Sequence, residues 1–159
     1  MFLEKKVFDG REIIVRSLKS GDIKLAEKFQ NHLNCLVKED AQILINKTLS
    51  IKQEREWLKD KIEKVKKRKT VFLFAQHNNK IVGSTDIDLE SWRQQHVGNF
   101  GIAIRNGYRG IGLGNYLVSE IIKLAKKELK PKPKIIKLAK TTPQIIKRFT
   151  LDFSGAAMG

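Results

Sequence analysis

Arg105-Asn106-Gly107-Tyr108-Arg109-Gly110-Ile111-Gly112-Leu113-Gly114 is a glycine-rich turn, with four of the chain's eleven glycines. β-rich residues at 97–104 predict a strand before it, and apolar residues recurring at helical spacing predict a helix at 115–129 after it. Glycine adopts backbone angles that turn successive N–H groups inward, and a helix N-terminus adds unpaired donors and partial positive charge. The turn therefore predicts a site for an anion such as a pyrophosphate, although a purely structural turn needs some of the same residues.

Two common phosphate-binding loops do not fit this turn. The nucleoside-triphosphate loop needs Lys followed by Ser or Thr after its glycines, and neither pair is present. A dinucleotide-binding fold needs the glycines after the first strand of a parallel unit and an acidic residue about 20 positions later, whereas residues 131–137 contain no acid.

Upstream of the turn, residues 11–18 predict a strand, and apolar residues at helical spacing predict a helix over about 22–33. Ser50-Ile51-Lys52-Gln53 has the spacing of a capping box and predicts the start of a second helix. The apolar stripe of that helix is expected to contain Trp57, Leu58, Ile62 and Val65, and its solvated face Lys59, Lys61, Lys64, Lys66 and Lys67.

Residues 71–75 and 81–87 predict an antiparallel hairpin, because Asn78-Asn79-Lys80 between them tolerates positive φ. Residues 135–138 predict another strand, and Thr142-Pro143 predicts the start of a last helix. The predicted order is βααβββαβα. No repeat, low-complexity segment or linker composition interrupts it, so we expect residues 1–159 to form a single domain.

Composition and charge describe a globular, strongly basic chain. Its 159 residues are 41% hydrophobic and carry a net charge of +15. No apolar run is long enough to span a bilayer, so we expect a cytoplasmic protein without membrane contact. The single Cys35 forms no internal disulfide, and no His/Cys cluster has metal-ligand spacing, so no metal is expected. The charge is compatible with a nucleic-acid partner, but we favour solvated lysines on helix surfaces.

At the turn, the sequence resembles the GCN5-related N-acetyltransferase (GNAT) family. Arg109, Gly112 and Gly114 occupy the positions of that family's coenzyme A signature. Residues 13–18 followed by Asp22 are similar to its opening strand and helix, and residues 100–104 are similar to its fourth strand. The resemblance covers most of residues 11–138 and implies an α/β fold with a mixed, mostly antiparallel central sheet flanked by helices.

The resemblance also implies a cosubstrate, acetyl-CoA, and a reaction, transfer of an acetyl group to a primary amine on a small molecule, a protein N-terminus or a lysine. The implied pyrophosphate-binding residues are Arg109, Gly110, Ile111, Gly112, Leu113 and Gly114, acting through backbone amides. The implied pantetheine-binding residues are Ile102, Ala103 and Ile104, which would lie where the family's fourth and fifth strands splay apart.

Candidate bases are the titratable residues near that strand. Glu90 and His96 lie at the ends of the two adjacent predicted strands, where either could accept a proton from the amine. Asp86 and Asp88 alternate along their strand and face either an amine pocket or solvent. Phe149 occupies the position where the family commonly has a Tyr that protonates the leaving thiolate, so Tyr108 or water would replace it, or the thiolate leaves unassisted.

The C-terminus is expected to be shortened relative to the family, which would leave a sheet edge uncovered and available for a homodimer contact. An alternative function follows from the same features. The +15 charge, Phe149 and the short C-terminus also fit a CoA-binding or basic nucleic-acid-binding module that kept the fold and lost turnover.

Overall fold

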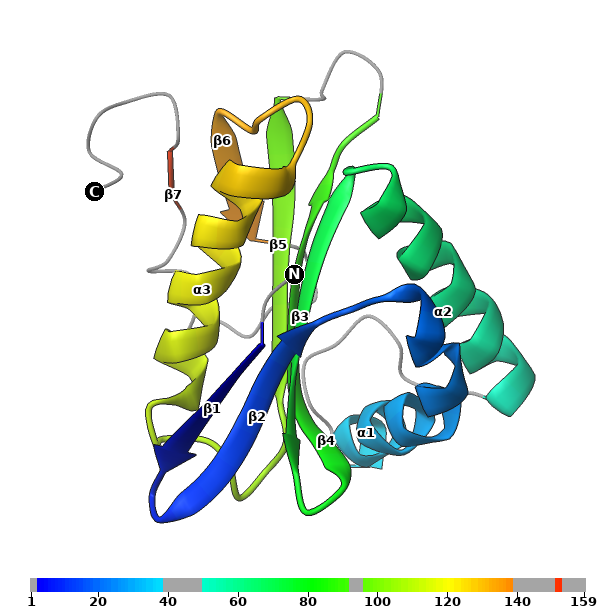
Figure 1. Cartoon of the computed structure of the whole chain (residues 1–159), viewed down its shortest axis with the longest axis vertical. Coiled ribbons are helices and arrows are strands. Elements are labelled where there is room, and N and C mark those ends of the chain that lie inside the picture. Colours follow the sequence, from blue (N-terminus) through cyan, green and yellow to red (C-terminus); the bar gives the residue numbers. More distant parts are fainter. Residues whose placement is uncertain (1–2, 39–49, 92–95, 139–150, 153–159) are drawn as a thin grey trace.

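The computed structural model of the chain describes residues 3–38, 50–91, 96–138 and 151–152 (Figure 1). The elements are β1 (Leu3–Phe8), β2 (Arg11–Ser17), the 3-10 helix η1 (Ser20–Leu25), α1 (Ala26–Lys38), α2 (Ile51–Lys66), β3 (Thr70–His77), β4 (Lys80–Leu89), β5 (Val97–Ile104), α3 (Leu113–Glu128), β6 (Ile135–Leu138) and β7 (Leu151–Asp152).

The strands form one sheet in the order of the sequence, from β1 to β7. All neighbours pair antiparallel except β5 and β6, which are parallel and are connected through α3. Figure 1 shows α3 on one side of the sheet and α1 with α2 on the other. This is the predicted mixed, mostly antiparallel sheet flanked by helices.

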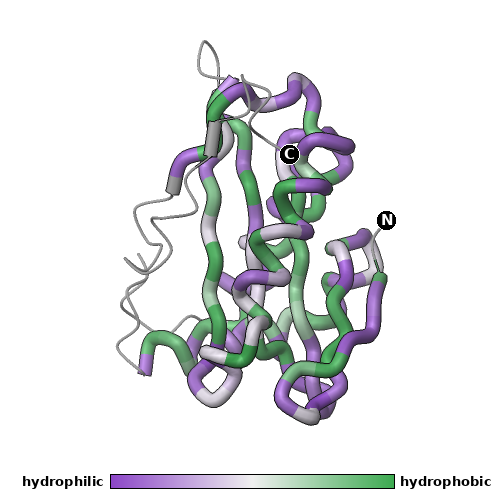
Figure 2. Tube along the Cα trace, turned by 90° about the vertical axis from the view of Figure 1, so that its left-hand side faces the viewer, coloured by the Kyte–Doolittle hydropathy of each residue, from purple (hydrophilic) through white to green (hydrophobic). Residues whose placement is uncertain are grey.

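Side chains of β3 alternate between the two faces and thereby divide the core. Val71, Leu73 and Ala75 belong to the cluster that packs on α3, whereas Phe72 and Phe74 belong to the cluster with residues of α1 and α2. Period-two alternation of this kind is what a strand buried on both faces requires. Figure 2 accordingly shows hydrophobic colour in the central strands and a mixture of both colours along the helices.

The starts of two elements follow the predicted local signals. The Ser50 Oγ accepts a hydrogen bond from the Gln53 N–H at 3.2 Å, and the Gln53 Oε1 accepts one from the Ser50 N–H at 2.9 Å, which confirms the capping box. Asn78 and Asn79 have φ of 48° and 63° and form the two-residue turn between β3 and β4. Short polar side chains tolerate this left-handed region better than others.

The structure differs from the predictions at several places. Strand β1 was not predicted, and the predicted helix at 22–33 is a 3-10 turn followed by a helix that continues to Lys38. Lys61 was expected on the solvated face of α2, but it is only 7% exposed because it reaches acidic residues on β4. A short β7 pairs with β6. The helix predicted from Thr142 lies outside the described residues. In the part of the chain that the structure describes, no helix has the length and apolar character needed to cross a membrane.

Candidate functional site

The glycine-rich turn connects the end of β5 to the start of α3. Gly107, Gly110 and Gly112 have φ of 89°, 73° and 92°, a region that residues with a side chain rarely adopt. Gly112 is the N-cap of α3, and no side chain caps this helix end. The first N–H groups of α3 therefore lack both an intrahelical acceptor and a side-chain acceptor. The turn has the donors that an anionic group requires.

Two further residues of the signature have structural contacts. The Arg109 Nε donates to the Ile104 carbonyl oxygen at 2.7 Å and holds the turn against the end of β5. Gly114 lies where α3 approaches β5, because a Cβ there would meet the Ile104 Cδ1 at 3.1 Å. The predicted cofactor residues at 102–104 and 109–114 are thus adjoining parts of one surface.

One edge of β5 is paired along only part of its length. On one side, β5 pairs with β4 from Gly98 to Ile104. On the other side, its pairing with β6 runs from Val97 to Phe100 only. Among the described residues, the segment from Gly101 to Ile104 has no strand partner on the β6 side. This segment includes Ile102, Ala103 and Ile104, for which the family resemblance implied a role in binding the pantetheine.

A pocket of about 170 Å³ adjoins this same segment, on the face of the sheet that carries α1 and α2. Its lining comprises Phe29, His32, Leu33 and Leu36 of α1, Glu54 and Trp57 of α2, and Phe72, Ser84, Thr85, Asp86, Gly101, Ile102 and Ala103 of the sheet. Small residues of β4 and β5 leave room for it. A Cβ at Gly101 would meet the Asp86 Oδ1 at 3.0 Å.

Two ionisable residues of the pocket are buried with unpaired atoms. Glu54 is 1% exposed and its Oε2 has no hydrogen-bond partner, so burial raises the pKa of this carboxyl to about 7. His32 is 4% exposed, and its Nδ1 has no partner while its Nε2 lies 3.4 Å from the Ser84 Oγ. Burial, together with the charge of Arg105, lowers the pKa of His32 to about 3. His32 is therefore neutral at pH 7.

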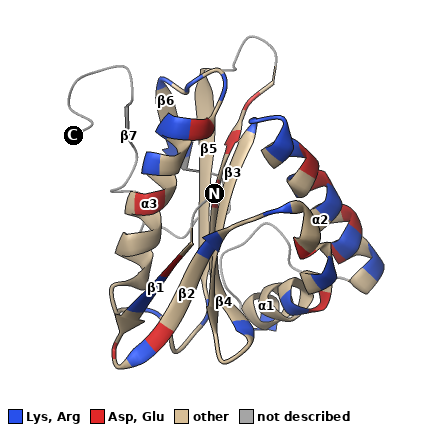
Figure 3. Cartoon of the chain, viewed as in Figure 1, with Lys and Arg blue, Asp and Glu red and all other residues tan. Residues whose placement is uncertain are grey.

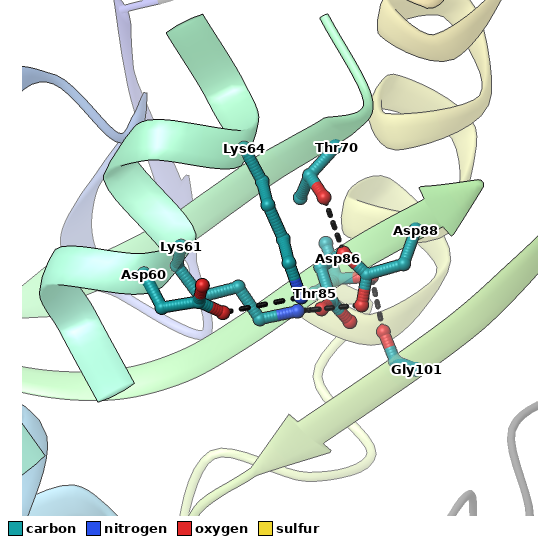
Figure 4. Close-up of polar contacts among 8 residues, drawn as sticks. All are labelled: Asp60, Lys61, Lys64, Thr70, Thr85, Asp86, Asp88 and Gly101. Carbon is teal, nitrogen blue, oxygen red and sulfur yellow. Dashed lines mark hydrogen bonds and ion pairs between the residues drawn. The ribbon is translucent and has the colours of Figure 1, made fainter. Parts of the chain in front are cut away.

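Asp86 and Asp88 form an ion-pair cluster with Lys61 of α2 (Figure 4). The Lys61 Nζ lies 2.8 Å from the Asp86 Oδ2 and 2.5 Å from the Asp88 Oδ2. The Thr70 hydroxyl also donates to Asp88. Burial raises the pKa of Asp86 to about 6 against the opposing effect of Lys61. Burial also acts to raise the pKa of Asp88, but Lys61 and Thr70 outweigh it and lower that pKa. Two carboxyls share one ammonium, so the cluster keeps one negative charge when both are ionised.

The two bases predicted from the sequence lie at the opposite end of β5. The Glu90 N–H donates to the Val97 carbonyl oxygen, and Val97 is the first residue of the strand that ends at Ile104. The Glu90 Oε1 forms an ion pair with Lys137 at 2.8 Å, and the hydrogen bond from Lys137 lowers its pKa. His96 is exposed just before β5.

The remaining chemical candidates lie elsewhere. The Tyr108 hydroxyl lies 2.8 Å from the His77 Nδ1 at the end of the sheet beside the glycine-rich turn. Phe149 lies outside the described residues. The part of the chain that the structure describes contains no group of three or more His, Cys, Asp or Glu residues that could hold a metal ion.

Glu54 was not among the predicted site residues, although the sequence contains a signal for it. Ile51, Leu58 and Val65 recur on one side of α2, and Glu54 lies three residues after the first and four before the second. An acidic residue in the phase of an apolar stripe is either a surface residue of a short helix or a buried group with a function. The spacing placed Glu54 on the buried side.

Lysine and arginine residues are interspersed with acidic residues along α2 (Figure 3). Ion pairs such as Lys64 with Asp60 at 3.1 Å and Lys66 with Glu63 at 3.4 Å lie along its surface. On α2 the cations thus alternate with anions.

Comparison with known proteins gave a family match and structural neighbours. The model of the Acetyltransferase (GNAT) family matches residues 37–144, which is more than half of the chain. No protein in the curated set matches.

Among solved structures, the acetyltransferase of the GNAT family from Streptococcus pneumoniae is 24% identical, with a TM-score of 0.67 over 80% of this chain and 74% of that one. The ribosomal-protein-S5-alanine acetyltransferase from Vibrio fischeri is 18% identical, with a TM-score of 0.66 over 85% and 73%. The microcin C7 self-immunity acetyltransferase, solved with acetyl-CoA and AMP, is 15% identical, with a TM-score of 0.58 over 79% and 68%.

At these identities the structural neighbours show a shared fold. The family match covers α2 to β6, including the glycine-rich turn and the open segment of β5. The chain therefore belongs to the GNAT family of acetyltransferases.

Proposed function

We propose that the chain is an acetyl-CoA-dependent N-acetyltransferase in which the cofactor and the acceptor amine meet at the open segment of β5. The observation that carries this proposal is the position of residues 101–103. They line the pocket, and on the β6 side they have no strand partner among the described residues. A thioester lying along the edge of β5 would thus be next to a cavity for the acceptor.

The cofactor half of the proposal assigns roles to backbone atoms. Amides at 109–114 would bind the pyrophosphate, and main-chain groups of Ile102, Ala103 and Ile104 would bind the pantetheine. In support, Gly110 has positive φ and open space where its Cβ would be, so a ligand can approach the bare backbone there. The microcin C7 self-immunity acetyltransferase, a structural neighbour, was solved with acetyl-CoA.

The acceptor half assigns the pocket between α1, α2 and the sheet to a primary amine. Direct attack on the thioester needs a neutral nitrogen held close to the carbonyl carbon and a group that takes its proton. The pocket supplies carboxyl groups and a neutral imidazole beside β5. Glu90 and His96 stay predictions, and the ion pair with Lys137 makes Glu90 a weaker base than a free carboxylate.

The cofactor assignment can be tested with two glycines in matched conformations. Gly110 and Gly10 have φ of 73° and 74°, and neither has a heavy atom within 4 Å of the position that a Cβ would occupy. Gly110→Ala and Gly10→Ala should therefore cost similar stability, about 1–2 kcal/mol each. Only Gly110→Ala should weaken acetyl-CoA binding, by at least 10-fold in calorimetric titration, because only Gly110 lies in the proposed pyrophosphate turn.

Thermal melts complete this test. Acetyl-CoA at about 100 times its Kd should stabilise the wild type by about 2.7 kcal/mol, whereas NAD or ATP at equal concentration should have little effect. Equal affinity of the two glycine variants, or a larger shift with NAD, would contradict the proposed cofactor site.

A further inference from the structure

Glu54 is the unpaired acid of the pocket. Its side chain is buried, its Oε2 has no hydrogen-bond partner, and in the described part of the chain it has no ion-pair partner. The other pocket carboxylate, Asp86, is paired with Lys61. A buried carboxylate without a partner is strongly unfavourable, so its presence in a cavity points to a ligand that supplies the missing partner.

The other ionisable groups around the pocket are either neutral or already paired. His32 of α1 is neutral, because burial and Arg105 lower its pKa to about 3. Lys61 of α2 is occupied by Asp86 and Asp88 of β4. Glu54 is therefore the carboxyl of the described lining to which no cation of the described chain is paired, whereas Asp86 shares Lys61 with Asp88.

The rest of the lining is largely apolar. Phe29, Leu33, Leu36, Trp57 and Phe72 surround the cavity. Phe29 and Trp57 contact each other with ring centroids 6.3 Å apart, and Trp57 and Phe72 are 6.0 Å apart. These walls favour a compact apolar group. The other carboxyl of the described lining, Asp86, is already bound by Lys61, so a second positive charge on the same ligand would compete with Lys61 for it.

We propose that Glu54 binds the amino group of the acceptor and takes its proton during acetyl transfer, and that the acceptor is a primary monoamine on a compact apolar group. This inference rests on the proposed function. The same chemistry is offered by a small free amine and by a peptide N-terminus with an apolar first side chain, and the experiments below separate these two sources.

The proposed step balances as follows. The bound ammonium first loses one proton to the Glu54 carboxylate, which passes it to solvent. The lone pair of the resulting neutral amine then forms a bond to the carbonyl carbon of the thioester, and the C–S bond breaks with its electron pair leaving on sulfur. The nitrogen loses one proton to the Glu54 carboxylate, and the thiolate takes one from solvent. Glu54 then releases its proton to solvent. A carboxyl whose pKa is raised to about 7 accepts a proton more readily than an exposed one and still ionises near neutral pH.

Replacement of the carboxyl by an amide of the same shape tests the catalytic role. Glu54→Gln should lower kcat by about 100-fold or more, the usual contribution of a general base, with acetyl-CoA affinity unchanged in calorimetric titration. Glu56→Gln is the matched control, because Glu56 is exposed on the same helix. Full activity of Glu54→Gln, or a comparable loss confined to Glu90→Gln, His96→Asn or Asp86→Asn, would overturn the assignment.

The pH profile separates proton transfer from a structural role. In the wild type, kcat/KM should rise with pH through a step near 7, followed by the step that belongs to the amine itself. The Glu54→Gln profile should lack the first step. Both proteins retain the neighbouring ionisable residues His32, Arg105, Asp86 and Lys61. If the step near pH 7 persists in the variant, another group causes it and the proposal is refuted.

The substrate class is tested with two amines of equal length. Pentylamine should be acetylated with kcat/KM at least 10-fold above that of 1,5-diaminopentane, because the second ammonium would have to compete with Lys61 for Asp86. A tripeptide amide beginning with Leu represents a peptide N-terminus. Whichever of pentylamine and this peptide has the higher kcat/KM shows whether the acceptor is a small free amine or a peptide. Preference for the diamine, or no turnover of either monoamine, would overturn the substrate class.

Binding can be followed without turnover. The chain has two tryptophans, so Trp92→Phe leaves Trp57, which lines the pocket, as the sole indole reporter. Pentylamine should change its fluorescence at pH 8, and Glu54→Gln should weaken this binding by at least 10-fold. Unchanged amine affinity in Glu54→Gln refutes the role of Glu54, whereas loss of acetyl-CoA binding by the wild type would refute the proposed function instead.

Discussion

The two faces of the sheet differ in whether ionisable residues are buried on them. The core cluster beneath α3 consists of apolar residues such as Leu117, Ile121 and Leu129, all with 0% exposure. The face beneath α1 and α2 contains the four ionisable residues that are buried in the described part of the chain, namely Asp22, His32, Glu54 and Lys61. One face thus contributes mainly hydrophobic stabilisation, and the other also contains chemically reactive groups.

The difference between the faces shows why the sequence revealed one half of the site more readily than the other. The cofactor half depends on backbone conformation, which Gly107, Gly110 and Gly112 indicate through their type alone. The acceptor half depends on which polar side chains of α1 and α2 are turned inward. That orientation is a property of tertiary packing, and each such residue is also a normal surface residue of a helix.

The largest expected effect comes from Lys61→Met. Removing the cation leaves Asp86 and Asp88 facing each other in a partly buried site, and loss of one partner of a buried ion pair costs about 3–5 kcal/mol. Without Lys61 the folded-state pKa values of both carboxyls rise above the unfolded values. The loss should therefore be complete at alkaline pH and smaller below about pH 4, where both are protonated.

Urea denaturation of Lys61→Met at several pH values measures this effect. Leu117→Ala on the other face is the matched comparison, with an expected cost of about 2–5 kcal/mol that does not vary with pH. If both variants lose the same free energy at every pH, the contrast between the two faces is wrong.

A smaller effect of opposite sign is expected from Glu54→Gln. The folded-state pKa of Glu54 is raised from 4.5 to about 7, so the folded state binds the extra proton between these values and wild-type stability falls as pH rises through them. At pH 8 the variant should exceed the wild type by up to about 3 kcal/mol, and the difference should vanish below pH 4. Denaturation curves at pH 4 and pH 8 check the sign. A variant less stable than the wild type at pH 8 would show that Glu54 has a stabilising partner.

The smallest effect is expected at the N-terminus of α2, the helix that contains both Lys61 and Glu54. Ser50→Ala removes the side-chain half of the capping box and should cost about 1 kcal/mol without pH dependence. Ser119→Ala, at an exposed position of α3, serves as the control and should be within about 0.5 kcal/mol of the wild type. A loss above 2 kcal/mol would mean that Ser50 does more than cap α2.

Local signals predicted the elements whose formation depends on nearby residues. The capping box marked the start of α2, and the Asn78-Asn79 turn marked the β3–β4 hairpin. Strand β1 was not predicted, because five of its six residues are exposed and the sequence therefore lacks the alternation of apolar and polar residues that indicates a half-buried strand. Its formation depends on pairing with β2.

Two bases proposed from sequence lie away from the open segment of β5 for a geometric reason. Glu90 and His96 were chosen because they adjoin the strand in sequence, but they adjoin its first residue, Val97. A strand advances about 3.3 Å per residue, so Ala103 lies about 20 Å from that end. Adjacency in sequence to a strand does not specify which end of it is near the chemistry.

The parallel pairing of β5 with β6 has a consequence for the order of folding. Strands β3, β4 and β5 are neighbours in the chain and can pair through short connections, whereas β6 reaches β5 only after α3 has crossed the sheet. Contacts between residues far apart in sequence form late because closing a long loop costs entropy. The proposed cofactor surface needs the start of α3 docked on the sheet, and Leu113 there belongs to one core cluster with Phe8 and Ile13, which are 100 or more residues away in sequence, so we expect acetyl-CoA to bind only near the end of folding. Acetyl-CoA should therefore slow unfolding and leave the folding rate unchanged.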